Sequence, residues 1–446
     1  MTARRNTDAL EISEDELALE FTDANPNHRW VDAWHKWFYW TGQVWREDST
    51  LHVFDLVRQF IRSNSWVSDK PKELLRATAI AAVEKLAKSD RAYAATTDQW
   101  DQHPMLLNTP SGMVDLRTGR VHEHSAEKYC TKITGTELRS GQCPRWLSFL
   151  NDICEKDAEL IAFLKRVSGY CLSGDTREHA LFFLHGFGGN GKSTFLNVLK
   201  GVMGDYATDA PMETFTASKG DRHPTELAKL NGSRLVVATE TEEGRRWAES
   251  RIKQLTGGDR VSARFMRQDF FEYVPQFKLV IAGNHKPRIQ NVDVAMRRRL
   301  HLVPFDASFQ GDKRVTDMEA RLKDEWPAIL GWMVDGCLEW QKQGLNPPKI
   351  VSEATEQYFT NQDMLSEWRA ECCDAGAGKW ESPTRLFASW REFAKAAQHP
   401  VGERSSFNDR MESAGFRQLK NKERGRHWPG IAVKLGSPSF SKERVW

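Results

Sequence analysis

The sequence predicts an α/β protein whose central element is a mostly parallel sheet, with further modules before and after it. Two observations support this fold class. Between residues 181 and about 306, apolar strand-like runs alternate with helical patterns, and this alternation is typical of parallel α/β sheets. The chain also has 446 residues, which is more than one hydrophobic core usually serves, so we expect several domains.

The composition is that of an ordinary soluble protein, with 40% hydrophobic and 28% charged residues. The formal net charge is only +2, so any nucleic-acid surface must be a local basic patch. The 7 cysteines include no C-x₂-C pair, which disfavours zinc and disulfides and fits a cytoplasmic location. No apolar run approaches the ~20 residues of a membrane span, and no signal-peptide pattern is present. We therefore expect no membrane partner.

The N-terminal part predicts a tryptophan-rich α+β module over residues 1–135 and a helical collar segment over 136–180. The elements expected in the module are a hairpin turning at Thr41 and Gly42, helices at 51–64 and 71–89, and short strands within 106–124. We expect the clustered aromatic residues to form a core rather than a ligand platform.

The turn after the first strand of the sheet matches the phosphate-binding P-loop. Residues 181–194 read LFFLHGFGGNGKST, a strand followed by G-x-x-x-x-G-K-[ST] and a helical pattern. Glycines let backbone N–H groups curl around a phosphate, and the helix N-terminus adds partial positive charge. Lys192 should reach the β- and γ-phosphates, and Ser193 should ligate Mg²⁺. The predicted ligands are ATP and Mg²⁺, held by Gly186, Gly188, Gly189, Asn190, Gly191, Lys192, Ser193 and Thr194.

Polar residues follow the next two strands of the predicted core, which spans residues 181–310. Glu240 and Glu242 end the run RLVVATETEE and point the same way on an extended chain. One carboxylate, which we assign as Glu240, would hold Mg²⁺ while the other orients the attacking water; which glutamate is the base stays open. A solvated strand end is the alternative. Asn284 follows the next strand and suits a sensor that contacts the lytic water or the γ-phosphate.

Arginines are the next candidate site residues. Arg298 and Arg299 lie directly before a further apolar strand, where either guanidinium could serve as an arginine finger for a neighbouring subunit. The segments VSARF and DFFEYV predict a β-hairpin with Arg264 and Arg267 at its basic tip. In a ring-shaped ATPase such a hairpin would project into the central pore; an ordinary charged hairpin is equally compatible with these residues.

The C-terminal part predicts a helical lid over residues 311–350, a linker at LNPPKI, and a domain over 351–446. Three helical patterns and then a basic β-hairpin favour a winged-helix domain that binds DNA. Its basic residues would contact phosphates, and the alternative is a protein-docking domain. The candidate DNA contacts here are Lys420, Lys422, Arg424 and Arg426.

Several motifs together resemble the superfamily 3 helicases of phage and plasmid primase–helicases, which are similar to the poxvirus primase–helicase ATPase. These motifs are K-x-L-x-G-G-D (253–259), F-K-L-x-x-x-G-N-H-K-P-R-I (277–289), R-R-L-x-L-V-P-F (298–305) and, upstream, W-x-x-W-x-G-x-x-W and L-N-x-x-x-G-x-x-D-L-R-T-G. The resemblance implies a hexameric AAA+ ring that translocates on single-stranded DNA. From the positions that match the family's motifs, the resemblance implies DNA contacts from Arg264 and Arg267. It also implies the roles in nucleotide binding and hydrolysis that are described above for Lys192, Ser193, Glu240, Glu242, Asn284 and one of Arg298 and Arg299.

The predicted function is therefore an ATP-dependent DNA helicase in the replication of a phage, prophage or plasmid, located in the host cytoplasm. Expected partners are single-stranded and forked DNA, further copies of the chain, and a separate primase. We expect no primer synthesis, because few residues precede the L-N-x-x-x-G motif. One alternative is an origin-binding initiator or loader that uses ATP as a switch. Another is a defence ATPase that remodels a target other than DNA.

Overall fold

The computed structural model describes residues 12–65, 71–217, 225–239, 246–266, 269–287, 289, 294–309, 315, 317–397, 401–421 and 424–434. The chain forms two compact units. Unit 1 comprises Met1–Ser140 with Val202–Tyr206, and unit 2 comprises Gly141–Gly201 with Ala207–Trp446.

Unit 1 combines helices with two small antiparallel sheets, which have the orders β1-β2-β3 and β4-β5-β6. Its main elements are, in order, α1 (Glu14–Ala24), β1 (His28–Val31), β2 (Lys36–Trp40), β3 (Trp45–Glu47), α2 (His52–Asn64), α3 (Pro71–Leu74), α4 (Ala77–Ala87), β4 (Leu106–Thr109), β5 (Gly112–Asp115) and β6 (Arg120–His122). The α+β character expected for the N-terminal module is thus observed.

The tryptophan-rich segment forms the predicted hairpin and supplies a core. Strands β2 and β3 pair as Trp40↔Trp45, and the Thr41 N–H donates to the Val44 carbonyl across the turn (3.0 Å). Trp45 and Trp100 are buried and lie in edge-to-face contact, with ring centroids 5.8 Å apart. Such contacts are favourable for aromatic pairs. The expectation that this aromatic cluster is a core is therefore confirmed.

Unit 2 begins with helices that precede the P-loop strand and continues through the sheet to the C-terminal elements. Its elements are, in order, α5 (Pro144–Ile153), α6 (Ala158–Leu172), β7 (Leu181–His185), α7 (Lys192–Met203), β8 (Ala207–Asp209), α8 (Thr225–Ala228), β9 (Leu235–Thr239), α9 (Glu249–Thr256), β10 (Val261–Ala263), β11 (Phe271–Tyr273), β12 (Lys278–Gly283), α10 (Val294–Arg297), β13 (Leu300–Pro304), α11 (Met318–Lys323), α12 (Trp326–Gln343), α13 (Lys349–Cys372), β14 (Cys373–Glu381), α14 (Pro383–Ala396), α15 (Arg404–Ser413), β15 (Leu419–Asn421) and β16 (Gly425–Val433).

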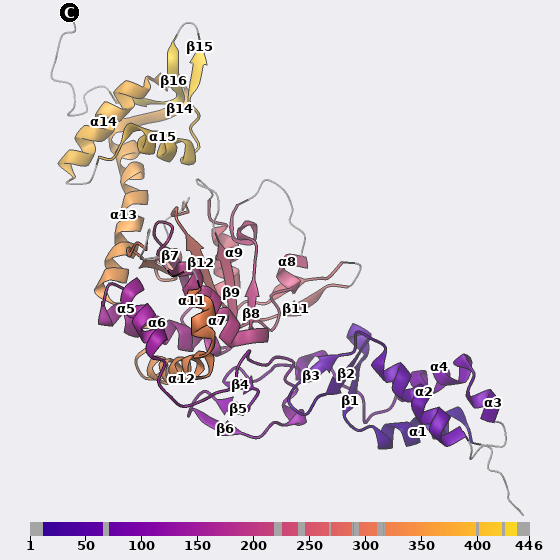
Figure 1. Ribbon diagram of the computed structural model, residues 1–446. Coiled ribbons are helices and arrows are strands. Elements are labelled where there is room, and N and C mark those ends of the chain that lie inside the picture. The colour runs from indigo at the N-terminus through magenta and orange to yellow at the C-terminus, as the bar shows by residue number, and fades with distance from the viewer. Residues whose placement is uncertain are drawn as a thin grey trace, which may run out of the picture. The chain divides into compact units, whose positions relative to one another are not determined.

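The central feature of unit 2 is a 5-stranded sheet in the order β13-β7-β12-β9-β8 (Figure 1). All its strand pairs are parallel. The strand residues are almost all buried, as in Leu181–Leu184 of β7, because helices cover both faces of a parallel sheet. The α/β class and the parallel sheet predicted from the sequence are confirmed.

The helices on either side of the core in sequence pack against each other. α6 and α12 cross so closely that a Cβ on Gly169 would overlap the Cys337 backbone, and one on Gly336 would overlap the Lys165 backbone. Lys165 and Glu339 add an ion pair of 2.6 Å across this crossing. Helices α6 and α12, which lie in the segments predicted as a collar and a lid, therefore share one packed interface.

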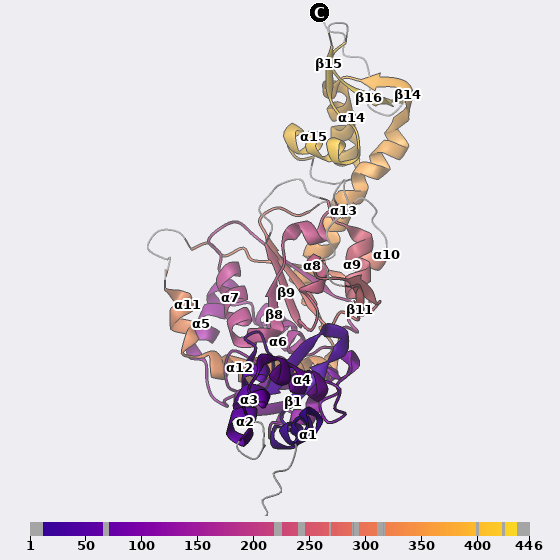
Figure 2. The ribbon, with the colours of Figure 1, turned by 90° about the vertical axis from the view of Figure 1, so that its right-hand side faces the viewer.

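Helix α13 leads from the elements of the parallel sheet to the C-terminal elements (Figure 2) and contributes residues to two hydrophobic cores. Its residues Tyr358 and Phe359 belong to the core of the parallel sheet, and the Thr355 hydroxyl oxygen accepts the Leu302 N–H of β13 (3.0 Å). Its residues Leu365 and Trp368 belong to the C-terminal core. The prolines of LNPPKI therefore precede a helix that joins the two cores.

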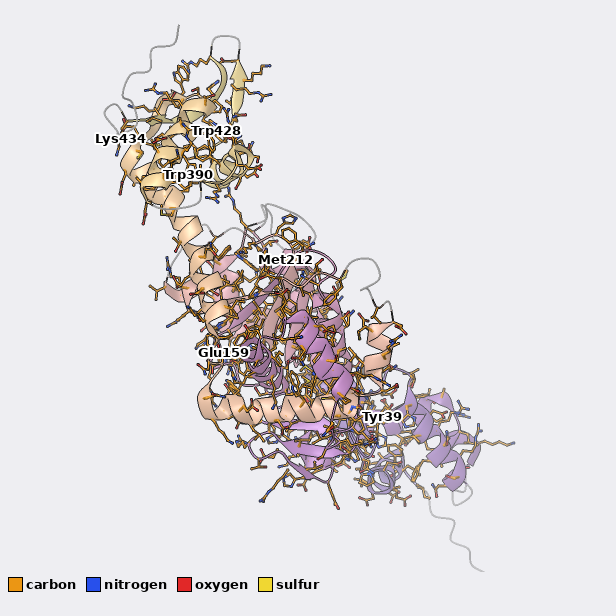
Figure 3. All side chains as sticks on the ribbon, turned by 60° about the vertical axis from the view of Figure 1, so that its left-hand side comes forward. Tyr39, Glu159, Met212, Trp390, Trp428 and Lys434 are labelled. Atoms are coloured by element: carbon orange, nitrogen blue, oxygen red, sulfur yellow. The ribbon has the colours of Figure 1, made fainter. Side chains whose placement is uncertain are left out.

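The C-terminal elements follow the order helix, strand, helix, helix, strand, strand, and the strands form a 3-stranded antiparallel sheet β14-β16-β15. Trp368, Trp390 and Trp428 are buried in its core, the last two of which are labelled in Figure 3. The segment before Ser382, which contains two glycines, forms strand β14 and pairs with β16 through a register shift between Ala375 and Trp380.

Within the described part of the chain, no helix combines the length and the apolar character that crossing a membrane requires.

Candidate nucleotide site and DNA contacts

The P-loop joins β7 to α7 at the carboxyl edge of the sheet. Gly189 and Gly191 have φ angles of +77° and +84°, which side chains with a Cβ rarely adopt. A Cβ on Gly191 would also come within 2.5 Å of the Ile153 side chain of α5. Glycine is therefore required at these positions by the local backbone and by the neighbouring helix.

Lys192 is the first residue of α7, and its ammonium group lies inside the loop. Only 6% of the residue is exposed. Its Nζ donates to the Gly186 carbonyl (2.6 Å), the Phe187 carbonyl (3.3 Å) and Asn190 Oδ1 (3.0 Å). A longer contact of 3.4 Å reaches Asn284 Oδ1. These acceptors are all neutral oxygens, so the buried charge has no carboxylate partner among the described residues.

Asn190 connects the P-loop to strand β13. Its Oδ1 accepts from Lys192, and its Nδ2 donates to the Phe305 carbonyl at 2.8 Å. The Phe305 N–H in turn donates to the His185 carbonyl (2.7 Å), and the Phe309 N–H donates to the Gly189 carbonyl (2.8 Å). The end of β13 therefore fixes both sides of the loop that positions Lys192.

Burial sets the protonation of the basic groups at this edge. It lowers the pKa of Lys192 to about 8, because a desolvated ammonium is less stable than a hydrated one. The pKa of His185 falls to about 4, first through burial and then through the charges of Lys286 and Lys192. His185 is therefore neutral near pH 7, and the positive charge beside the loop comes from the lysines.

The parallel strands bring the predicted polar residues to one edge. Gly283 pairs with His185, so Asn284, the next residue, lies beside the start of the P-loop. Thr239, the last residue of β9, pairs with Ala282. Glu240 and Glu242 follow Thr239 in sequence but lie outside the described residues. Among the predicted site residues, the structure thus brings Lys192 and Asn284 into contact.

The two finger candidates have different environments. The side chain of Arg299 is buried, with Nε donating to Thr256 Oγ1 (3.2 Å) and one terminal nitrogen donating to the Ala295 carbonyl (2.9 Å). Arg298 is exposed. Arg299 is therefore occupied with contacts inside its own chain, whereas Arg298 is accessible to a second molecule.

The predicted hairpin with the basic tip is present, as the antiparallel pair β10 and β11. Its base is buried at Val261 and Ala263. Towards the tip, Arg264 lies 4.6 Å over the ring of Phe270, and Phe270 is 59% exposed. Arg267 lies outside the described residues. The hairpin is confirmed, and its role as a DNA contact stays a prediction.

The C-terminal basic hairpin is formed by β15 and β16, which pair Lys420 with Arg426. Lys420, Arg424 and Arg426 are all exposed, and Lys422 lies outside the described residues. Among the residues that the structure describes, none of these three cations has a carboxylate partner. The hairpin therefore presents exposed positive charge that has no carboxylate partner in the described part of the chain.

These features fit a nucleoside triphosphate. A chain of phosphates requires a glycine cradle, a helix N-terminus and a cation that is free to pair with it. The buried ammonium of Lys192 has no counter-charge among the described residues. Ser193 is exposed next to Lys192 and can offer its hydroxyl to Mg²⁺. No group of three or more metal-binding side chains occurs among the described residues, and Glu240, the predicted carboxylate ligand of Mg²⁺, lies outside them.

The sequence did not identify two groups of the site, His185 and the Phe305 carbonyl. His185 directly precedes Gly186, so its position was visible, but its neutral state depends on burial and on neighbouring lysines. The Phe305 carbonyl that holds Asn190 is 115 residues away in sequence, and no local pattern connects the two.

Fold and site together define an α/β protein with an NTPase-like core. Two family models match the chain, one described as "D5 N terminal like" over residues 18–155 and one as a family of unknown function, DUF5906, over residues 184–299. The second match includes the P-loop, Asn284 and both finger candidates.

The chain is also similar to several viral proteins. L207/L206 of Acanthamoeba polyphaga mimivirus, named as a candidate helicase, is 24% identical over 293 residues, which is 60% of this chain and 30% of that protein. Candidate helicase 022R of Frog virus 3 is 26% identical over 253 residues, 52% of this chain and 26% of that protein. Primase D5 of fowlpox virus is 26% identical over 234 residues, 49% of this chain and 29% of that protein.

The matches to the D5 N-terminal-like model and to these viral proteins make the chain similar to D5-like primase–helicases related to poxvirus D5, in agreement with the resemblance noted in its motifs. The match spans less than a third of the length of each of these three relatives. Among solved structures, the A form apo structure of the NrS-1 C-terminal region has a TM-score of 0.48 and 8% identity, covering 95% of this chain and 100% of that chain.

Proposed function

We propose that this protein is an ATP-dependent DNA helicase acting in the replication of a phage, prophage or plasmid, as a ring of copies that moves along single-stranded DNA. The observation that carries the proposal is the buried ammonium of Lys192 in a glycine cradle, without a carboxylate partner among the described residues. The part of the proposal that concerns DNA is supported by the similarity to viral proteins that are named as helicases.

In this proposal the nucleotide site is completed by residues from two copies. Lys192 leaves its contacts with the loop carbonyls and binds the β- and γ-phosphates, while Asn190 keeps it in place. Ser193 and Glu240 hold Mg²⁺, which neutralises charge on the phosphates. Glu242 or Glu240 accepts the proton of the attacking water, and Asn284 orients that water. Arg298 of a neighbouring copy stabilises the transferring phosphoryl group, because Arg299 is already bonded inside its own chain.

The DNA contacts belong to two separate hairpins. Arg264 and Arg267, at the tip formed by β10 and β11, bind the phosphates of the single strand inside the ring. The C-terminal elements have the order of a winged-helix domain, in which β15 and β16 form the wing. Lys420, Lys422, Arg424 and Arg426 of this wing bind duplex phosphates, which position the protein but do not specify sequence.

Substitution of Lys192 by alanine tests the proposal. The wild-type chain should hydrolyse ATP faster when single-stranded DNA is added and should separate a forked duplex. The Lys192→Ala variant should lose both activities, because the phosphates then lack their buried counter-charge. Both activities are measured by phosphate release and by strand separation on a labelled fork. Unwinding that survives the substitution would refute the assignment.

A second candidate function is an origin-binding initiator or loader in which ATP acts as a switch. The exposed cations of the C-terminal hairpin favour it, because such a surface can hold duplex DNA without any translocation. Footprinting on the origin of the genetic element, beside the strand-separation assay, distinguishes the two functions. Sequence-specific protection without unwinding would support the initiator.

A further inference from the structure

Trp380 differs from the other tryptophans of the C-terminal domain. Trp368, Trp390 and Trp428 are fully buried, whereas Trp380 is 40% exposed. All the other tryptophans that the structure describes are buried or half-buried. The exposed part of the ring is not removed from water and contributes no burial free energy, so a ligand that covers this part would gain that energy.

The surroundings of Trp380 are basic. The Arg424 guanidinium lies over its ring, 5.0 Å from the centroid, and the His427 ring meets it edge-on at 6.1 Å. Arg424 comes from the turn between β15 and β16, and its backbone N–H donates to Asn421 Oδ1 (2.7 Å). That bond fixes the turn that carries the arginine. We call this pair, Trp380 with Arg424, the wing platform.

The exposed lysine and arginine side chains around the wing platform favour an anionic ligand. Lys420 and Arg426 lie opposite each other on the two strands that end in this turn. On β14 the neighbouring Lys379 is already paired with Asp374 (3.4 Å). Among the described residues, Lys420, Arg424 and Arg426 have no carboxylate partner and are exposed, so phosphates can reach them. The exposed part of the Trp380 ring, beside the guanidinium of Arg424, can contact a flat apolar partner.

An unpaired nucleotide combines these two properties. A base inside a duplex has both faces covered by its neighbours, whereas an unstacked base offers a face to an aromatic side chain. Aromatic stacking on single-stranded nucleic acid is tolerant of base identity, and arginine adds a cation–π contribution. A duplex alone would use the cations of the wing but not the tryptophan.

We propose that the wing platform binds an unpaired base at the junction between double-stranded and single-stranded DNA. The base stacks on Trp380, Arg424 contacts its phosphate, and Lys420 with Arg426 hold the adjoining duplex. The inference rests on the proposed DNA-binding role of this domain. It adds that the domain binds DNA with a fork or an overhang in preference to DNA with a blunt end.

The experiment uses the full chain and two DNA stem-loops that differ only at the end of the stem. One is blunt, and the other carries a short overhang with 2-aminopurine as the unpaired base, whose fluorescence is quenched by stacking. Wild type should prefer the overhang and quench its fluorescence. Trp380→Ala should weaken binding to the overhang by about tenfold or more, remove the quenching, and leave binding to the blunt stem within about twofold.

Two matched variants accompany this substitution. Leu419→Ala removes a side chain that is 53% exposed on the same sheet and should behave as wild type. Trp380→Phe should retain part of the quenching, because a smaller aromatic ring still stacks. Binding of Trp380→Ala to the blunt stem, if it stays within about twofold of wild type, shows that the C-terminal domain of the variant is folded.

The outcomes separate this inference from the proposed function. If Trp380→Ala keeps the overhang preference and the quenching, the platform is refuted. If Lys420→Ala with Arg426→Ala leaves blunt-stem binding unchanged while Trp380→Ala still abolishes quenching, the duplex contact is refuted and the platform stands. Loss of blunt-stem binding in the double variant, with quenching lost only in Trp380→Ala, supports both.

Discussion

The candidate nucleotide site and the proposed C-terminal wing, which is formed by β15 and β16, both present positive charge, but they hold it in opposite ways. Lys192 is 6% exposed and is held by loop oxygens and by Asn190. Lys420, Arg424 and Arg426 are exposed on a short hairpin. The first arrangement desolvates one cation in a fixed cradle, whereas the second spreads several hydrated cations over a surface.

The difference shows which ligand each region suits. A single buried cation binds strongly only when a ligand matches the geometry of its cradle, as a triphosphate does in a P-loop. Exposed cations bind a polyanion by releasing its counterions, and each contributes a small and similar amount. Loss of the single buried cation should therefore abolish nucleotide binding, whereas loss of one exposed cation should only weaken the binding of DNA to the wing.

Arg298 tests the limit of this comparison, because it is exposed in one copy and should become enclosed when a second copy covers it. Arg298→Ala should lower the rate of ATP hydrolysis by ~10³–10⁵-fold while nucleotide binding changes little. Hydrolysis is measured by phosphate release, and binding by titration with a non-hydrolysable ATP analogue. Arg299 is an unsuitable control, since its buried contacts make it part of the fold. A full hydrolysis rate in Arg298→Ala would assign the finger elsewhere.

The buried cation makes nucleotide binding depend on pH. The pKa of Lys192 is about 8 in the free protein, and phosphates that favour its charged form would raise that pKa on binding. Binding therefore takes up a proton above about pH 8, so affinity should fall as the pH rises, by at most about tenfold per pH unit. Titrations with the analogue between about pH 7 and pH 9 measure this.

Two other groups near Lys192 bear on that titration. His185, with a pKa of about 4, does not titrate in the range used. Burial also lowers the pKa of Lys286, so a Lys286→Gln variant serves as the control and should keep the same pH dependence. An affinity that stays constant across the range in wild type would contradict the role given to Lys192.

The wing should show the smallest effect of single substitutions. Removing Lys420 or Arg426 should weaken binding to blunt duplex by roughly a few-fold, and should reduce the slope of log affinity against log salt by ~0.9 per lost phosphate contact. Fluorescence anisotropy over a range of salt concentrations measures both. If a single substitution removed all duplex binding, the wing would resemble a fixed cradle and the comparison would fail.

The sequence predicted the parts of the molecule that depend on local pattern. The strand before the P-loop is a continuous apolar run and the loop has fixed glycine spacing, so β7, the P-loop and α7 were predictable. The basic hairpin at the C-terminus was predictable for the same reason. Strand β14 was not, because the sequence CDAGAGKWE lacks an alternation of apolar residues and its central residues are exposed.

Features that depend on tertiary contacts could not be predicted. Arg298 and Arg299 are adjacent and chemically identical, and only the packing of Thr256 and Ala295 shows that Arg299 is occupied. The prolines of LNPPKI indicated a linker. Only the contacts of Thr355 and Tyr358 with the sheet show that the helix after them packs on the core.

The central claim is that nucleotide is cleaved between adjoining copies of the chain, and mixing two inactive variants tests it most directly. Lys192→Ala retains Arg298, and Arg298→Ala retains Lys192, so some interfaces of a mixed assembly contain both groups. We predict that ATP hydrolysis reappears when the two variants are combined with single-stranded DNA. Absence of hydrolysis at every mixing ratio, with both variants shown to assemble together, would contradict the claim.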